Sequence, residues 1–193
     1  MSKHAYSLPN ILTYGRIVAV PLVVLCFFLE GRLQSSDPAR WTALGIFVLA
    51  SVTDFLDGYL ARIWKQTSTI GRMLDPIADK LLVSACLLLL AADGTIAGWT
   101  LWAAIIILCR EILVSGLREY LAELKVSVPV SRMAKWKTTL QMIAIAFLLA
   151  GPAGDKIMPY TTEIGITLLW AAALITLYTG WDYFRAGLKH VIG

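Results

Sequence analysis

Eight residues with the chemistry of a metal and phosphate site lie where the second long apolar stretch of this 193-residue chain ends and the third begins. In chain order they are Asp54, Asp57, Gly58, Ala61, Arg62, Gly71, Asp75 and Asp79. Each aspartate lies inside or at the end of an apolar stretch, where an uncompensated charge costs at least ~2.5–3.5 kcal/mol. Four carboxylates persist there only if cations neutralise them, which predicts metal ions that hold a phosphate-rich substrate.

The spacing of the aspartates predicts that they meet as two pairs. Asp54 and Asp57 are three residues apart near the end of one predicted helix, so both lie on one face. Asp75 and Asp79 are four residues apart at the start of the next helix and also share a face. We expect the connection containing Gly71 to turn the chain so that the faces meet. Two hard divalent ions held by such oxygens can stabilise the attacking and leaving oxygens of a phosphoryl transfer.

The remaining residues of the pattern suit an anionic ligand. Gly58 and Ala61 are small enough for a ligand to approach the backbone, and Arg62 carries a guanidinium fork that binds phosphate. The alternative is that the aspartates only cap helices and pair with nearby cations, which are Arg62, Arg72 and Lys80.

Composition indicates that this pattern belongs to a membrane protein. Apolar residues make up 58% of the chain and charged residues 16%, whereas soluble domains are about 45–50% apolar. The apolar stretches cover residues 12–30, 40–62, 74–92, 96–118, 134–151 and 162–184. A spanning helix needs ~20 residues, so we expect an all-α fold with six transmembrane helices in one domain, residues 1–193. Ser7 to Asn10 is expected to lie at the membrane interface, or else to be a disordered tail.

The distribution of lysine and arginine predicts the orientation in the membrane. These residues are concentrated at both termini and in the 62–72 and 118–137 connections, and they are fewer in the alternate connections. The positive-inside rule then places both termini and the 62–72 connection in the cytoplasm. A formal net charge of +4 is too modest to indicate a nucleic-acid partner.

The pattern from Asp54 to Asp79 resembles the signature of the CDP-alcohol phosphotransferase family at all eight positions. The resemblance implies a six-helix membrane enzyme, usually a homodimer, in which an alcohol displaces CMP from a CDP-linked donor. It implies two Mg²⁺ ions, or Mn²⁺, bound by Asp54, Asp57, Asp75 and Asp79, with Asp79 also acting as the base. It further implies contacts with CDP-diacylglycerol from Asn10, Thr13, Gly58, Ala61, Arg62, Ser68 and Gly71.

Three other runs are similar to members of that family that use glycerol 3-phosphate as the acceptor. These runs are Pro9 to Thr13 with Arg16, Arg110-Glu111 with Ser115 to Glu119, and Lys135 to Thr139 with Gln141. The resemblance implies transfer of the phosphatidyl group from CDP-diacylglycerol to sn-glycerol 3-phosphate in the inner membrane of a bacterium.

The basic residues of the fourth and fifth apolar segments favour a phosphorylated acceptor on physical grounds. Such an acceptor needs an anion site beyond the metals, and arginine binds phosphate through two parallel hydrogen bonds. The residues expected to form this site are Arg110, Arg118, Lys135 and Lys137.

Alternatives remain for these basic residues and for the acceptor. The basic residues can also serve only to set the topology and contact lipid headgroups, and Arg110-Glu111 can be a structural ion pair. The acceptor can be inositol phosphate, serine or phosphatidylglycerol in a sibling enzyme. A cation transporter built from the same carboxylates is the alternative from another functional class.

Overall fold

The computed structural model describes residues 8–28, 37–64, 69–124 and 132–192, and its regular structure in these ranges is entirely helical. The helices are α1 (Leu8–Phe28), α2 (Asp37–Trp64), α3 (Thr69–Ala92), α4 (Thr100–Glu123), α5 (Arg132–Asp155) and α6 (Thr161–Ile192). Side chains are described in these ranges except at 8–10, 55–64, 69–70, 72, 132, 134–135 and 186–192. The predicted all-α class is confirmed for the described ranges.

Within the described ranges, three helices are long and apolar enough to cross a membrane. Candidate spans cover Ile11–Phe28 in α1, Thr100–Glu123 in α4 and Thr161–Arg185 in α6. The protein is therefore a helical membrane protein. That all six helices span the bilayer stays a prediction, as does the interfacial position of the segment before α1.

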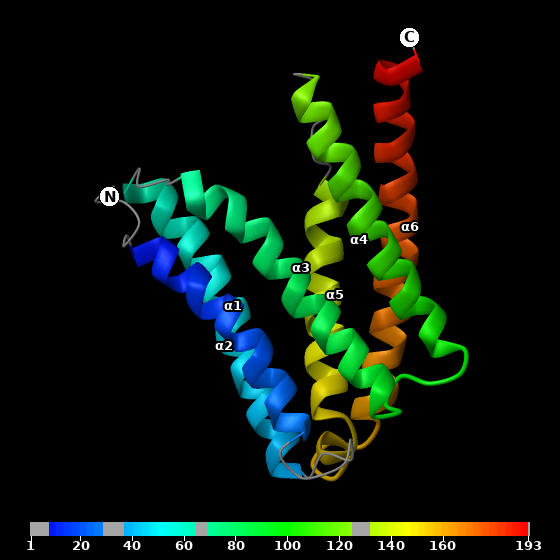
Figure 1. Ribbon diagram of the computed structural model, residues 1–193. Coiled ribbons are helices and arrows are strands. Elements are labelled where there is room, and N and C mark those ends of the chain that lie inside the picture. The colour runs from blue at the N-terminus through cyan, green and yellow to red at the C-terminus, as the bar shows by residue number, and fades with distance from the viewer. Residues whose placement is uncertain (1–7, 29–36, 65–68, 125–131, 193) are drawn as a thin grey trace.

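The helices form two groups joined through α5 (Figure 1). Helix α1 packs against α2 and α3, whereas α6 packs against α4 and α5, and both α2 and α3 contact α5. At the upper end of Figure 1 lie the start of α1, the end of α2, the start of α3 and the C-terminal ends of α4 and α6. The α3–α4 and α5–α6 connections lie at the lower end.

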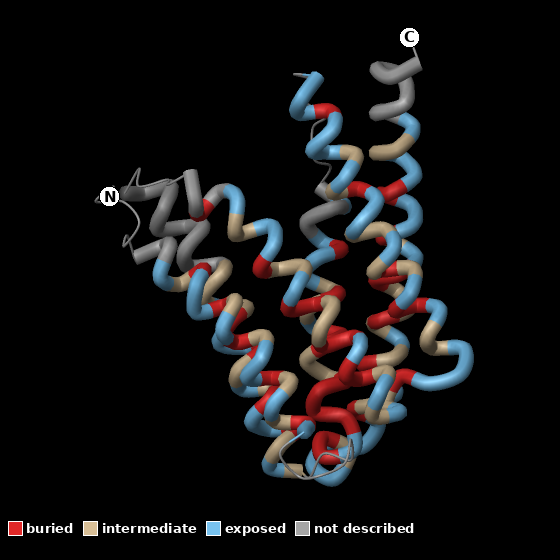
Figure 2. The backbone as a smooth tube through the Cα atoms, viewed as in Figure 1, coloured by how far each residue is buried: buried red, intermediate tan, exposed pale blue. Residues whose placement is uncertain are grey.

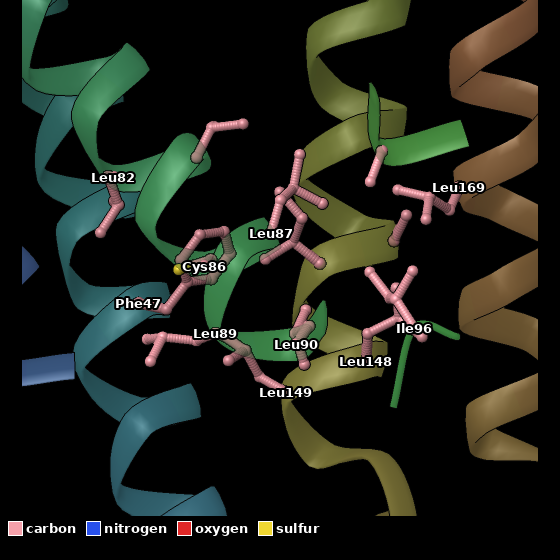
Figure 3. Packing of buried hydrophobic residues seen from close by; sticks show 14 of the residues in the cluster. Phe47, Leu82, Cys86, Leu87, Leu89, Leu90, Ile96, Leu148, Leu149 and Leu169 are labelled. Atoms are coloured by element: carbon pink, nitrogen blue, oxygen red, sulfur yellow. The ribbon is translucent and has the colours of Figure 1, made fainter. Parts of the chain in front are cut away.

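The hydrophobic core is concentrated in the lower half of the molecule, where buried residues are densest (Figure 2). In Figure 3, Cys86 and Leu90 of α3 lie with Phe47 of α2 and with Leu148 and Leu149 of α5. Lipid tails are as apolar as leucine, so close packing rather than exclusion of water stabilises such helix contacts. Buried residues of α1, α2, α3 and α5 belong to this one core, which determines how these helices pack against one another.

Helix α5 bends at Gly151, where the sequence predicted that the helix ends. Gly151 has φ 43° and ψ −130°, which interrupts the helix, and helical structure then resumes to Asp155. Pro152 explains the resumption, because the first turn of a helix tolerates a residue without a backbone N–H. The predicted end at residue 151 was therefore wrong by four residues.

Gly71 also lies elsewhere than the sequence predicted. Helix α3 begins at Thr69, so Gly71 is buried in its first turn and is not part of a connecting loop. Arg72, Met73 and Leu74 follow Gly71 and are strong helix formers. They allow α3 to begin before residue 74, where the predicted apolar stretch starts. The connection between α2 and α3 is correspondingly shorter than expected.

Candidate active site

Helix α1 brings two polar side chains to the upper end of the molecule. Thr13 and Arg16 are three residues apart, so they share one face of α1, and they are only 2% and 1% exposed. Helices α2 and α3 pack against α1. An arginine buried in an apolar helix needs anionic partners, and α2 and α3 supply them.

Arg16 contacts carboxylates from two different helices. Its Nη2 lies 2.7 Å from Oδ1 of Asp54 in α2. Its Nη1 donates a hydrogen bond to Oδ1 of Asp79 in α3, at 2.8 Å. One guanidinium thus joins the two helices that carry the predicted metal ligands.

Thr13 makes the corresponding contact with Asp75, the third of the predicted metal ligands whose side chains are described. Its hydroxyl donates a hydrogen bond to Oδ1 of Asp75 at 2.6 Å. A threonine hydroxyl has a single proton, so this hydrogen bond competes with donation to a substrate phosphate. The predicted contact between Thr13 and CDP-diacylglycerol stays a prediction, and the geometry gives Thr13 the role of orienting Asp75.

The three aspartates form an open group with an excess of negative charge. The side chains of Asp54 and Asp79 are 42% and 47% exposed, and Asp54, Asp75 and Asp79 lie close enough for their charges to repel one another. Three negative charges and the one positive charge of Arg16 leave two negative charges. Carboxylate oxygens are the ligands that Mg²⁺ and Mn²⁺ prefer, so the chemistry of these donors suits a divalent ion.

The other predicted residues at this end lie outside the described side chains. Within the part of the chain that the structure describes, no group of three or more acidic, histidine or cysteine side chains is arranged so that it could hold a metal ion. The side chain of the predicted fourth metal ligand, Asp57, is not among the described side chains. Ser68 lies outside the described residues, as do the side chains of Asn10, Gly58, Ala61 and Arg62.

A second polar group joins α4, α5 and α6. Lys137, only 2% exposed, forms an ion pair with Glu111. Arg110 Nη1 lies 3.4 Å from Oε1 of the same glutamate. Gly180 of α6 makes room for Arg110, because a Cβ there would lie 3.0 Å from its Cγ. The structure thus brings Arg110 and Lys137 together around Glu111.

Arg118 occupies a different environment from Lys137. It is exposed, its guanidinium lies 5.9 Å from the ring centre of Tyr183, and its charge reaches Arg110 and Lys137. A role in topology or headgroup contact fits the exposed Arg118, but it does not fit the buried Lys137. The side chain of Lys135 is outside the described part of α5.

Arg16 is the residue of this site to which the sequence patterns assigned no role. Arg16 was noted only as part of a flanking run, although an arginine inside an apolar stretch is itself a signal of function. Its three-residue spacing from Thr13 adds a second signal, since both then share one helix face. For Glu111, the structure shows the ion pair with Arg110 that the sequence offered as an alternative, and a second ion pair with Lys137, which is 26 positions away and was not expected.

Comparisons with known proteins agree with the resemblance drawn from the motif. A family model for CDP-alcohol phosphatidyltransferases matches residues 6–178. A Rickettsia bellii protein named CDP-diacylglycerol–glycerol-3-phosphate 3-phosphatidyltransferase is 46% identical over 184 residues, covering 95% of this chain and 97% of the relative. Proteins with the same name are 39% identical in Cereibacter sphaeroides (96% of this chain, 97% of the relative) and 40% identical in Haemophilus influenzae (93% and 92%). The chain therefore belongs to the CDP-alcohol phosphatidyltransferase family.

Proposed function

We propose that this protein transfers the phosphatidyl group from CDP-diacylglycerol to sn-glycerol 3-phosphate, forming phosphatidylglycerophosphate and CMP. The observation that carries the proposal is the convergence of Asp54, Asp75 and Asp79 on one face of α1 at one end of the molecule. The names of the relatives, which cover nearly the whole chain, support both substrates.

In the proposed reaction, an acceptor hydroxyl oxygen bonds to the phosphatidyl phosphorus as the bond from that phosphorus to the CMP oxygen breaks. Asp79 takes the hydroxyl proton, and its 47% exposed side chain suits a base that must meet a soluble substrate. Asp54, Asp57, Asp75 and Asp79 would hold two Mg²⁺ ions, or Mn²⁺. When bound, such ions offset the charge that develops on the phosphate oxygens.

The donor and the acceptor would be held by different residues. Asn10, Thr13, Gly58, Ala61, Arg62, Ser68 and Gly71 would surround the CDP part of the donor. Arg110, Arg118, Lys135 and Lys137 would bind the phosphate of the acceptor. Three cations of this group, Arg110, Arg118 and Lys137, and the single carboxylate of Glu111 leave two positive charges, which suits a dianionic phosphate.

The proposed setting is the inner membrane of a bacterium. Both termini and the carboxylate end would face the cytoplasm, from which the water-soluble glycerol 3-phosphate would enter. The diacylglycerol tails of the donor would lie against the lipid-facing helices. We include a homodimer in the proposal because it is the usual state of the family.

An acceptor competition tests the proposed function. Purified protein in detergent micelles receives CDP-diacylglycerol, Mg²⁺ and one of four acceptors, namely glycerol 3-phosphate, inositol phosphate, serine or phosphatidylglycerol. We expect CMP release and lipid product chiefly with glycerol 3-phosphate. Preference for another acceptor would contradict the acceptor assignment. Absence of CMP release with all four, together with cation flux in proteoliposomes, would favour the transporter.

A further inference from the structure

Among the charged side chains described at the upper end, Arg16 is the most deeply buried. Its side chain is 1% exposed, whereas its two aspartate partners are nearly half exposed. A buried guanidinium cannot move to water without unpacking α1 from α2 and α3. The position of the arginine is therefore set by the fold, and the carboxylates reach inward to it.

The described contacts of Arg16 involve one oxygen of each partner. Both Asp54 and Asp79 contact the guanidinium through Oδ1. Each carboxylate has a second oxygen and several lone-pair directions, and each side chain is open to the outside. The same two side chains can consequently serve Arg16 and a divalent ion in turn, or both at once.

The charge balance explains why such an arginine is needed. Asp54, Asp75 and Asp79 repel one another across the α2–α3 contact. Without a divalent ion, Arg16 supplies the positive charge seen among them in the described residues, and Thr13 adds a hydroxyl donor for Asp75 from the same face of α1. Helix α1 thus contacts Asp54, Asp75 and Asp79.

We propose that Arg16 is a positioning residue that serves as the internal counter-cation of the carboxylate site. It holds Asp54 and Asp79 together when no divalent ion is bound, and it competes with such ions for both carboxylates. The inference rests on the proposed function only in assuming that these carboxylates bind divalent ions. It does not depend on which acceptor is used.

Two measurable properties follow from this role. Loss of the Arg16 charge destabilises the protein most when divalent ions are absent, because the carboxylates then repel one another with no cation between them. The same loss strengthens divalent-ion binding, because a competing positive charge is gone. If Arg16 were purely structural, its loss would lower stability equally with and without divalent ions and would leave divalent-ion affinity unchanged.

Arg40 offers a matched control at the lower end of the molecule. It is also a buried arginine, with its side chain 6% exposed, and it pairs with Asp93 of the α3–α4 connection. In the described contacts of Arg40, one carboxylate meets one guanidinium, so no negative charge is in excess. Loss of the Arg40 charge should therefore destabilise the protein equally with and without divalent ions.

The experiment compares thermal unfolding of purified wild type, Arg16→Met and Arg40→Met in detergent, each in EDTA and in saturating Mg²⁺. In EDTA we expect both variants to unfold at a lower temperature, by roughly 5–10 °C. Mg²⁺ should recover at least half of the loss in Arg16→Met and none of the loss in Arg40→Met. Calorimetric titration should show Mg²⁺ binding to Arg16→Met roughly tenfold more tightly than to wild type.

Arg16→Lys covers the case in which Arg16→Met cannot be isolated. Lysine keeps the charge but has a single nitrogen, so it should show a smaller loss in EDTA that Mg²⁺ corrects. A loss that is the same in EDTA and Mg²⁺, or unchanged Mg²⁺ affinity, would overturn the role of Arg16. If wild type itself neither binds Mg²⁺ nor releases CMP, the proposed function fails instead, and the two failures are distinguishable.

Discussion

Arg16 at the upper end and Arg40 at the lower end are both buried arginines paired with aspartate, yet their surroundings differ in two respects. At the lower end, Asp93 is 1% exposed and uses both oxygens, one for Arg40 and one for the Thr95 backbone N–H. At the upper end, Asp54 and Asp79 are nearly half exposed and share the Arg16 guanidinium, and Asp75 adds a third carboxylate that Thr13 contacts. The balanced, closed pair is suited to holding helices together, and the open, negatively charged group is suited to binding a cation.

The lower group also shows what a structural arginine does in this fold. Arg40 Nη1 lies 3.5 Å from the carbonyl oxygens of Leu148 and Leu149, just before the bend at Gly151. A Cβ at Gly151 would lie 2.6 Å from that nitrogen. Pro152 has no N–H to offer the carbonyl four residues earlier, that of Leu148, so Arg40 supplies a donor where the helix cannot.

The largest difference in CMP release between the two ends should appear when an aspartate at each end is replaced by asparagine. We expect Asp54→Asn to lower CMP release by on the order of 10³-fold or more, because it removes a metal-binding oxygen and a full charge. Asp57→Asn should do the same. Both variants should remain folded and membrane-inserted, as judged by size-exclusion chromatography. Normal CMP release by either variant would contradict the assignment of that aspartate to the metal site.

Asp79→Asn distinguishes the general base from the other carboxylates of the upper group. As the general base, Asp79 should contribute roughly 10²–10⁴-fold to turnover. Turnover at saturating substrate should fall by that factor, while the affinity for CDP-diacylglycerol changes much less. If donor affinity collapses and saturated turnover stays near normal, Asp79 is a binding ligand rather than the base.

Asp93→Asn is the matched change at the lower end. It leaves the Arg40 guanidinium buried without its anionic partner, which should cost about 3–5 kcal/mol in the free energy of unfolding. Denaturant titration measures that loss, and CMP release per folded molecule should stay near the wild-type value. A folded Asp93→Asn protein that has lost CMP release would mean that the lower group takes part in the reaction.

The smallest expected effects concern the basic residues near the second polar group. Arg118→Ala or Lys135→Ala removes one charge-assisted phosphate contact, worth ~1.5–3 kcal/mol, and should raise the KM for glycerol 3-phosphate roughly tenfold to a hundredfold. The KM for CDP-diacylglycerol should stay within about threefold.

Lys156→Ala is the control for these variants, because Lys156 is 65% exposed and pairs with Asp37 at the lower end. It should change neither KM. If Arg118→Ala and Lys135→Ala keep the wild-type KM for glycerol 3-phosphate, these two residues serve only to set the topology.

Several features of the fold and the site were predictable from local sequence patterns. The apolar stretches predicted six helices, and the structure has six in its described ranges, with ends that differ by up to eight residues where polar segments continue a helix. Asp54, Asp75 and Asp79 were expected to converge, and they do meet the same face of α1. Periodicity and charge within one helix were sufficient for these predictions.

The pairing of distant charges was not predictable in the same way. Arg16 lies 63 positions from Asp79, and Arg40 lies 53 positions from Asp93. Which cation meets which carboxylate depends on how α1, α2 and α3 pack, and a local pattern does not contain that information. The bend at Gly151 was missed for the same reason, since Arg40 comes from another helix to fill it.

The most direct test of the difference between the two ends is CMP release by wild-type protein whose divalent ions have been removed with EDTA and then titrated back. With CDP-diacylglycerol and glycerol 3-phosphate present, we predict no CMP release before Mg²⁺ is added. We predict recovery to full turnover as Mg²⁺ saturates the protein. Full turnover in excess chelator would contradict the assignment of the upper carboxylates to a divalent-ion site.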